Sequence, residues 1–315
     1  MTREELKREV IRLKKEKNVL LLAHYYQEDD IQDVADFVGD SYGLSMEAAK
    51  TDKDTILFCG VHFMAETAKI LNPTKKVLLP DLEAGCSLSD NCTYDDFKAF
   101  KERYPDHVVV MYINCSAAVK TISDYIVTSS NAEKIVNSIP KDKKIIFAPD
   151  RNLGRWVQKV TGREMVMWDG SCVVHEAFAM EKMMKLMNQY PEAELIAHPE
   201  STEDVLKLAD FVGSTAKMLN YVKSSPKNTF IIATEAGILY KMKESSPEKI
   251  LIPAPVEEEN TCACSLCAYQ RVNTLQKVYD TLVNETPEIF LEEEVMDKAR
   301  VAIERMIEIT ESVNV

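Results

Sequence analysis

The chain has 315 residues, of which 46% are hydrophobic, and its formal net charge is −13. That acidic balance makes nucleic acids and anionic membranes poor candidate partners. Apolar runs such as residues 19–23 are far shorter than the roughly 18 residues that a membrane-spanning helix needs. The residues that follow Met1 lack the apolar core of a signal peptide, so the sequence predicts a cytoplasmic protein.

The first segment has the pattern of an amphipathic helix. Residues 2–17 are mostly charged, and apolar side chains recur among them at helical spacing, at Leu6, Val10, Ile11 and Leu13. We therefore predict a helix that packs one face on the body of the protein.

The next segment has a pattern of four parts. It consists of an apolar run, a pair of polar residues, an aspartate and a hydroxyl residue. Residues 19–23 predict a buried strand, which ends at His24 and Tyr26. Asp36 follows His24 by twelve positions, and Ser41 follows Asp36 by five. The segment then closes on a cysteine.

The same pattern occurs twice more along the chain. In both copies the aspartate again follows the first polar residue by twelve positions, and a hydroxyl residue follows the aspartate by five. The second copy consists of residues 108–111, Tyr112, Asn114, Asp124 and Ser129. The third copy consists of residues 195–197, His198, Glu200, Asp210, Ser214 and Thr215. Three agreeing copies identify an internal repeat, and such a repeat fixes the architecture.

Each copy alternates between strand and helix patterns. Apolar residues five and two positions before each aspartate share one helical face, which predicts a helix there. Two further apolar runs in each copy predict strands, at residues 56–58 and 77–79, 145–147 and 165–167, and 230–232 and 250–252. Each unit is thus predicted as strand, helix, strand, helix, strand and loop. This order is typical of parallel sheets covered by helices on both faces.

We therefore predict an α/β protein of three homologous three-layer α/β repeats with short parallel sheets, arranged with pseudo-threefold symmetry around a central active site. The predicted units are residues 1–86 together with 268–315, residues 87–172, and residues 173–267. Further helices are predicted at residues 91–104, 174–189, 268–283 and 292–313. We expect the last two to fold back onto the first unit, and the methionines of 174–189 to pack in a core.

Polar residues leave the first strand of every unit in pairs. Ligands of parallel α/β units bind at the carboxyl ends of the strands, and a spacing of two puts both members of a pair on one side of an extended chain. The members are His24, Tyr26, Tyr112, Asn114, His198 and Glu200. One such pair could be an ordinary strand end, whereas three equivalent pairs favour a shared central cavity.

The hydroxyl residues Ser41, Ser129 and Thr215 stand at the same offset in the three copies. A hydroxyl beside free backbone N–H groups at a helix start suits a carboxylate or a phosphate. Any one of them could be a plain helix cap, but the three together favour a small anionic ligand.

Cysteines close the repeats, and they carry the most specific chemical signal. Cysteine is scarce in this long chain, with 8 residues, so a disulfide framework is a weak interpretation. Cys86, Cys172 and Cys267 end the three copies, and thiolates that meet on the pseudo-axis would form a three-ligand metal site with one open position. Thiolate ligands select zinc or an iron–sulfur cluster. Cys59 and Cys115, at the ends of apolar runs, are predicted core residues.

Seven short motifs share their order with one enzyme family. They are residues 23–27, 39–41, 84–88, 112–114, 169–176, 197–200 and 213–215, which extend over nearly the whole chain. In these motifs the chain resembles the quinolinate synthase family, the iron–sulfur enzymes of NAD biosynthesis. The resemblance implies three homologous α/β domains in a pseudo-threefold triangle with a cluster at the centre.

The resemblance also implies a reaction and a cofactor. Iminoaspartate and dihydroxyacetone phosphate would condense to quinolinate, phosphate and water, and another enzyme would supply the iminoaspartate. A [4Fe-4S] cluster would be held by Cys86, Cys172 and Cys267, and its open iron would act as a Lewis acid.

Site residues follow from the same resemblance. The implied substrate-binding residues are His24, Ser41, Tyr112, Asn114, Ser129, His198, Glu200, Ser214 and Thr215. The implied catalytic residues are Tyr26, Glu200 and His198, because a carboxylate and a phenol facing one intermediate suit enolisation and dehydration. His175 could serve the site directly or from behind it.

Several alternatives stay open at this point. The family commonly has Cys-Pro after its third ligand, whereas Ala268 follows Cys267 here; we choose Cys267 over Cys264 because residues 273–275 keep the family's downstream register. The roles of Cys262 and Cys264 are undecided. Another iron–sulfur hydro-lyase acting on a small hydroxy acid, a non-enzymatic iron–sulfur carrier or redox sensor, and a structural zinc protein are the competing functions.

Overall fold

The computed structural model describes residues 1–257 and 265–312, so that Cys262 and Cys264 lie outside the described residues. Its first element confirms the predicted helix, as α1 (Arg3–Glu16). The hydroxyl of Thr2 accepts the backbone N–H of Glu5, and the Glu5 carboxylate accepts the N–H of Thr2 at 2.8 Å. This reciprocal capping fixes the helix start, while Leu6, Val10 and Leu13 are buried.

Three four-stranded parallel sheets follow along the chain. The first, in the order β2-β1-β3-β4, contains β1 (Val19–His24), β2 (Phe37–Gly39), β3 (Thr55–Cys59) and β4 (Lys76–Leu78). The second, in the order β6-β5-β7-β8, contains β5 (His107–Tyr112), β6 (Tyr125–Val127), β7 (Lys144–Ala148) and β8 (Met165–Met167). The third, in the order β10-β9-β11-β12, contains β9 (Glu194–Ala197), β10 (Phe211–Val212), β11 (Thr229–Ala233) and β12 (Ile250–Pro253). The predicted fold class is confirmed.

Helices connect the strands of each sheet in the same order. In the first unit they are α2 (Asp29–Val34), α3 (Ser41–Lys50) and α4 (His62–Leu71). In the second they are α7 (Ala117–Lys120), α8 (Ala132–Ser138) and α9 (Arg151–Thr161). In the third they are α12 (Glu203–Leu208), α13 (Thr215–Ser224) and α14 (Ile238–Ser245). The helix predicted before each aspartate is present in every unit.

Each unit has one strand more than the sequence predicts. The two or three residues after each aspartate, which we assigned to no strand, form the short edge strands β2, β6 and β10. The prediction of three strands per unit is wrong because such a short strand shows no alternation of apolar and polar residues along the chain.

The aspartates hold these edge strands in register. A carboxylate oxygen of Asp36 accepts the backbone N–H of Leu21 at 2.8 Å, and the Asp36 N–H donates to the carbonyl of Leu21 at 2.8 Å. Asp124 and Val109 repeat this exchange at 2.7 and 3.1 Å, and Asp210 and Leu195 repeat it at 2.8 and 2.8 Å. Each aspartate therefore ties the start of its edge strand to the central strand of its sheet.

The connecting and terminal helices are shorter than predicted. Residues 91–104 contain only α6 (Tyr94–Glu102), which follows α5 (Ser87–Asp90), and Thr93 caps it by accepting the N–H of Asp96. The segment 174–189 is divided into α10 (Val173–Glu176) and α11 (Met180–Gln189). The segment 268–283 is divided into η1 (Gln270–Val272) and α15 (Leu275–Asn284). The last helix is α16 (Glu293–Glu311).

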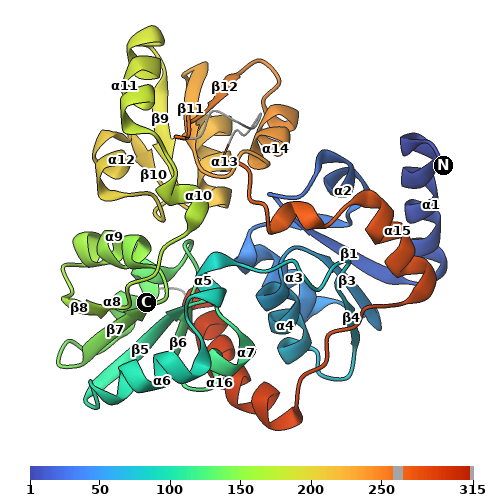
Figure 1. The fold of residues 1–315 in the computed structure, drawn as a ribbon, viewed down its shortest axis with the longest axis horizontal. Coiled ribbons are helices and arrows are strands. Elements are labelled where there is room, and N and C mark those ends of the chain that lie inside the picture. The colour runs from blue at the N-terminus through green and yellow to red at the C-terminus, as the bar shows by residue number, and fades with distance from the viewer. Residues whose placement is uncertain (258–264, 313–315) are drawn as a thin grey trace.

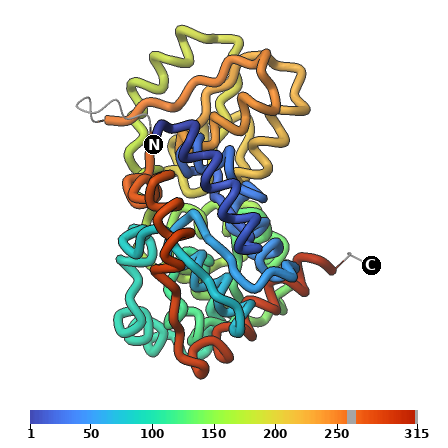
Figure 2. Tube along the Cα trace, turned by 90° about the vertical axis from the view of Figure 1, so that its right-hand side faces the viewer, coloured from blue at the N-terminus to red at the C-terminus, as the bar shows by residue number. Residues whose placement is uncertain are grey.

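Figure 1 places the three units at the corners of a triangle, with the first at the right, the second at the lower left and the third at the top. In Figure 2 the first unit faces the viewer, and α1 crosses its outer face. Helix α15 packs against α1, whereas α16 packs on α7, α8 and β6 of the second unit as well as on α4 of the first. The last helix therefore bridges two units.

The three units also meet through side chains. The Ser130 hydroxyl of the second unit donates to the Asp40 carboxylate of the first at 2.8 Å and lies 3.0 Å from the Ser214 hydroxyl of the third. Cys59 and Cys115 are fully buried, as predicted. Of the methionines in α11, Met183 is buried, but Met184 is 55% exposed, so only part of that helix faces a core. Among residues 1–257 and 265–312, no helix combines the length and the apolar character of a membrane span.

The aspartate exchange gives a first prediction. We expect Asp210→Ala to lower the free energy of unfolding by about 1–3 kcal/mol, because the buried N–H of Leu195 loses its acceptor. Asp210→Asn should cost less, since an amide oxygen still accepts that bond. Asp142→Ala, at an exposed position, is the control. Denaturant unfolding measures all three, and equal stability of the Asp210→Ala and Asp142→Ala proteins would contradict the assigned role.

Candidate active site

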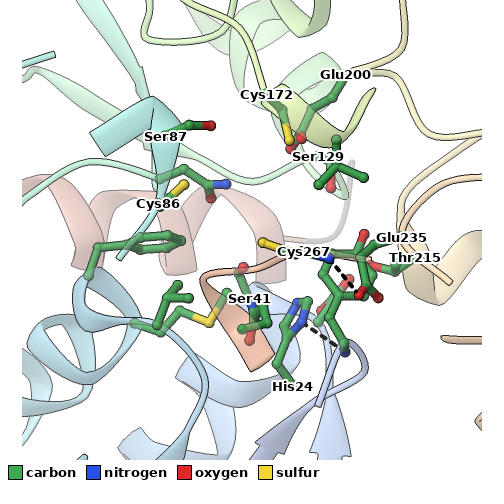
Figure 3. Close-up of a pocket in the computed structure, with 18 of the residues that line it drawn as sticks. His24, Ser41, Cys86, Ser87, Ser129, Cys172, Glu200, Thr215, Glu235 and Cys267 are labelled. Atoms are coloured by element: carbon green, nitrogen blue, oxygen red, sulfur yellow. Dashed lines mark hydrogen bonds between the residues drawn. The ribbon is translucent and has the colours of Figure 1, made fainter. Parts of the chain in front are cut away.

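One cavity lies where the three units meet, and residues of all three line it (Figure 3). The predicted site residues that line it are His24, Tyr26, Ser41, Cys86, Tyr112, Asn114, Ser129, Cys172, His198, Glu200, Thr215 and Cys267. Ser214 stands behind Thr215, where its hydroxyl caps α13 and contacts Ser130. The repeat therefore brings together positions that lie far apart in the sequence.

The two strand-end histidines have the same local geometry. The ring Nδ1 of His24 accepts the backbone N–H of Tyr26 at 3.3 Å, and Nδ1 of His198 accepts the N–H of Glu200 at 3.4 Å. With Nδ1 occupied as an acceptor, the proton of a neutral ring is assigned to Nε2. In His198 this Nε2 lies 3.1 Å from the Ser129 hydroxyl.

Burial keeps both rings neutral. It lowers the pKa of His24 to about 3, with a further contribution from the nearby His198. It also lowers the pKa of His198 to about 4, although the Glu200 carboxylate opposes the shift. Both residues are therefore neutral N–H donors at physiological pH.

Glu200 is an ionised carboxylate in a buried position. The Tyr112 hydroxyl donates to its Oε1 at 2.5 Å, and Nδ1 of His175 lies 3.0 Å from its Oε2. Burial alone would raise the pKa of Glu200, but His198, His175 and the Tyr112 hydroxyl outweigh burial and lower it to about 2. The carboxylate is thus a proton acceptor whose partners come from two units.

A threonine that the sequence analysis missed connects this carboxylate to the predicted phenol. The Thr234 hydroxyl lies 3.0 Å from the Tyr26 hydroxyl and 3.0 Å from Nε2 of His175. Hydrogen bonds therefore lead from Tyr26 through Thr234 to Nε2 of His175, and a 3.0 Å contact joins Nδ1 of His175 to Glu200. Thr234 directly follows β11, so the strand-end rule would have found it had we applied it beyond the first strand of each unit.

Burial keeps the two phenols protonated. It raises the pKa of Tyr26 and of Tyr112 well above the ordinary value, and the charge of Glu200 raises both further. Each is consequently a hydroxyl donor and neither is a phenolate. His175 contacts the network from behind, since it is 2% exposed and is absent from the cavity lining as the structure describes it.

Each of the three cysteines starts a helical turn. Cys86 is the N-cap of α5, Cys172 is the N-cap of α10, and the carbonyl of Cys267 accepts the N–H of Gln270 at the start of η1. Each sulfur faces the backbone N–H of the residue three positions on, and Figure 3 shows the three side chains directed toward one another. Burial raises the pKa of Cys86 to about 12 and of Cys267 to about 11, and it raises that of Cys172 as well.

This donor set fits a thiolate-bound metal centre. Three sulfurs converge in a buried space, the N–H groups directed at them favour thiolates, and a bound metal displaces the thiol proton. A second set, Cys172, His175 and Glu200, has ligand atoms within 4.8 Å of one another. Because Thr234 and Tyr112 already contact His175 and Glu200, the three cysteines are the better candidate ligands.

Anions would meet neutral donors in this cavity. Helices α3 and α13, of 10 residues each, begin at Ser41 and Thr215, and both residues line the cavity, so two helix N-termini lie beside it. Among the described residues that line it there is neither a lysine nor an arginine, whereas Asp40, Glu200 and Glu235 are acidic. The site therefore suits ligands that are bound through hydroxyl, imidazole and helix N–H groups.

Comparisons with known proteins agree on one family. The family model described as quinolinate synthetase A protein matches residues 8–308. A quinolinate synthase of Microcystis aeruginosa is 57% identical over 298 residues, which are 95% of this chain and 93% of that protein. A quinolinate synthase of Synechocystis sp. is 57% identical over 295 residues, which are 94% of this chain and 92% of that protein. One of Prochlorococcus marinus is 54% identical over 310 residues, which are 98% of this chain and 92% of that protein.

The buried histidines make stability depend on pH. Between pH 7 and pH 5 the unfolded chain binds a proton at His198 that the folded protein, with its lowered pKa, does not bind. Acidification over this range should therefore lower the free energy of unfolding by about 1–2 kcal/mol for this ring. Glu200 is ionised in both states here and adds nothing.

Denaturant unfolding at pH 7 and pH 5 measures this dependence. The His198→Gln protein should lose less stability on acidification than the wild type, because it has one buried ring fewer. His62→Gln removes a ring that is 40% exposed and serves as the control. An unchanged pH dependence in the His198→Gln protein would contradict the prediction.

Proposed function

Because this chain belongs to the quinolinate synthetase A family, a family of enzymes, we propose that it condenses iminoaspartate with dihydroxyacetone phosphate to form quinolinate, phosphate and water. Quinolinate formed in this way would enter NAD biosynthesis. The observation that carries the proposal is a single buried cavity in which three thiols face an acid–base network. The runner-up, another iron–sulfur hydro-lyase acting on a small hydroxy acid, would need no phosphate pocket.

The proposed cofactor is a [4Fe-4S] cluster held by Cys86, Cys172 and Cys267, one cysteine from each repeat. When bound, such a cluster supplies one iron that has no protein ligand and can polarise a substrate oxygen as a Lewis acid. The N–H groups of Ser89, His175 and Gln270, which face the three sulfurs, would stabilise the thiolates.

The substrates would be oriented by neutral donors. Carboxylate and phosphate oxygens would accept hydrogen bonds from the Ser41 and Thr215 hydroxyls and from the free N–H groups of α3 and α13. The Nε2–H groups of His24 and His198, Ser129 and the Asn114 amide would bind further oxygens. Ser214, which caps α13 and contacts Ser130, would hold Thr215 in place.

Proton transfer would run through the network around Glu200. Its ionised carboxylate would remove a proton from a carbon next to the carbonyl or imine of the intermediate, and Tyr112 would stabilise the carboxylate meanwhile. Tyr26 would donate a proton to a departing hydroxyl, and Thr234 and His175 would return one from Glu200. General acid–base groups of this kind contribute about 100- to 10,000-fold to a rate.

The cluster assignment can be tested on each cysteine. After anaerobic reconstitution we expect about four irons per chain in the wild type, and loss of the visible iron–sulfur absorbance in Cys86→Ala, Cys172→Ala and Cys267→Ala. Cys115→Ala removes a fully buried thiol that lies outside the cavity lining, and it should keep the cluster. A cluster that survives Cys267→Ala would remove this residue from the ligands, and zinc without a chromophore would favour a structural metal.

The reaction can be tested on the network. With both proposed substrates the wild type should form quinolinate, while Glu200→Gln should keep the cluster and form it about 100-fold more slowly or not at all. Thr234→Val should show a smaller loss, because it breaks only the path from Tyr26. Near-normal turnover in Glu200→Gln would contradict the assigned base.

The same assay separates the competing functions. An intact cluster that gives no quinolinate from these substrates would favour the hydro-lyase. A cluster spectrum that does not respond to added quinolinate, with no turnover, would favour a carrier or redox sensor.

A further inference from the structure

We propose that Glu235 is a positioning residue, which holds the loop that carries Cys267 so that its thiol points to the other two. This inference rests on the proposed cluster. Glu235 follows Thr234 at the end of β11, is 1% exposed and lines the cavity. The proposed reaction gives it no task.

Both carboxylate oxygens of Glu235 accept backbone N–H groups. Oε1 accepts the N–H of Cys267 itself at 3.0 Å, and Oε2 accepts the N–H of Gly237 at 2.7 Å. The guanidinium of Arg271, which follows Cys267 by one helical turn, lies 3.7 Å from Oε1. The carboxylate is thus bound on one side to its own loop and on the other to the cysteine.

Two further hydrogen bonds also join the segment around Glu235 to the loop that carries Cys267. The Ser265 hydroxyl donates to the carbonyl of Thr234 at 2.9 Å, and the N–H of Ala236 donates to the carbonyl of Ser265 at 3.1 Å. Residues 234–236 therefore form a docking site for residues 265–267. Among these contacts, only that of Glu235 reaches the cysteine.

The position of the carboxylate is itself fixed by packing. A Cβ atom on Gly237 would stand 2.8 Å from Oε2 of Glu235 and 2.9 Å from the Cα of Tyr26. No side chain larger than hydrogen fits there without displacing one of them. The backbone at Gly237 therefore lies close against the carboxylate of Glu235, whose two oxygens are held by the N–H groups of Gly237 and Cys267.

The alternative is that Glu235 is a second proton acceptor in the cavity. The partners of Glu200 are mainly side chains that can exchange protons, whereas both oxygens of Glu235 are bound to backbone N–H groups that cannot. Loss of a residue that orients a metal ligand typically weakens metal binding by about 10- to 100-fold. Loss of a base would leave metal binding unchanged.

A matched control lies in α4 of the first unit. Glu66 is also a buried glutamate; its Oε2 accepts the backbone N–H of Ala117 at 2.8 Å, and Nδ1 of His62 lies 3.7 Å from its Oε1. It is absent from the described lining of the cavity. Glu66→Ala should therefore disturb the fold in a comparable way without removing a contact of Cys86, Cys172 or Cys267.

The experiment measures iron loss from reconstituted protein to an excess of chelator under anaerobic conditions, followed by the visible absorbance. We expect Glu235→Ala to lose iron about tenfold faster than the wild type, and Glu66→Ala to match the wild type. Glu235→Gln should fall between, because its amide oxygen can still accept the N–H of Cys267 while its amide nitrogen cannot accept that of Gly237. Unchanged iron loss in Glu235→Ala, or equal acceleration in Glu66→Ala, would overturn the proposal.

A second measurement separates this inference from the cofactor it rests on. In iron-free protein, iodoacetamide should alkylate Cys267 faster relative to Cys172 in Glu235→Ala than in the wild type, as quantified by mass spectrometry. A wild type that assembles no cluster would refute the proposed cofactor, and the alkylation ratio would still decide the role of Glu235. An unchanged ratio would refute that role.

Discussion

An ionised carboxylate buried where three units meet is the constraint on which this structure depends. Glu200 stays charged only because hydrogen-bond donors surround it, and a buried charge without such partners costs several kcal/mol. Tyr112, which donates to Oε1, comes from the second unit, and His175, whose Nδ1 lies 3.0 Å from Oε2, comes from the third. Asn152 of α9, in the second unit, donates to the backbone carbonyl of Glu200 at 3.1 Å. Correct docking of the units is therefore required for the charge as well as for the cavity.

Some residues of the repeat are the same in all three units, and others differ from unit to unit. Asp36, Asp124 and Asp210 make the same exchange with the central strand in each unit, because every unit needs the same frame. The closing cysteines are also alike, which fits the proposed cluster, since three equal ligands suit threefold geometry. The strand-end pairs differ among the units, which fits the proposed reaction, since an asymmetric substrate would need donors at one position and a base at another.

The sequence predicts which residues line this site, but it predicts few of the hydrogen bonds among them. Repeated spacing located the strand ends, the hydroxyls and the cysteines, because a parallel sheet turns chain order into spatial order. It did not reveal the short edge strands, which are too short to show a periodic pattern and are held by pairing with the neighbouring strand and by the aspartate exchange. Nor did it reveal Thr234 and Glu235, because we applied the strand-end rule only to the first strand of each unit. The contact of Thr234 with Tyr26 forms only when the first and third units dock, and that of Glu235 with Cys267 joins residues 32 positions apart.

Neutral donors explain how a base can work beside anionic ligands. A lysine or arginine in the cavity would bind a carboxylate or phosphate strongly, but it would also lower the basicity of Glu200 still further. Helix N-termini and neutral imidazoles act over shorter distances, so in the proposed reaction α3 and α13 would hold an anion without neutralising the base. Burial keeps His24 and His198 in that neutral form. Burial of these polar side chains lowers the free energy gained on folding, and the same burial keeps the two histidines in the neutral form that the proposed chemistry needs.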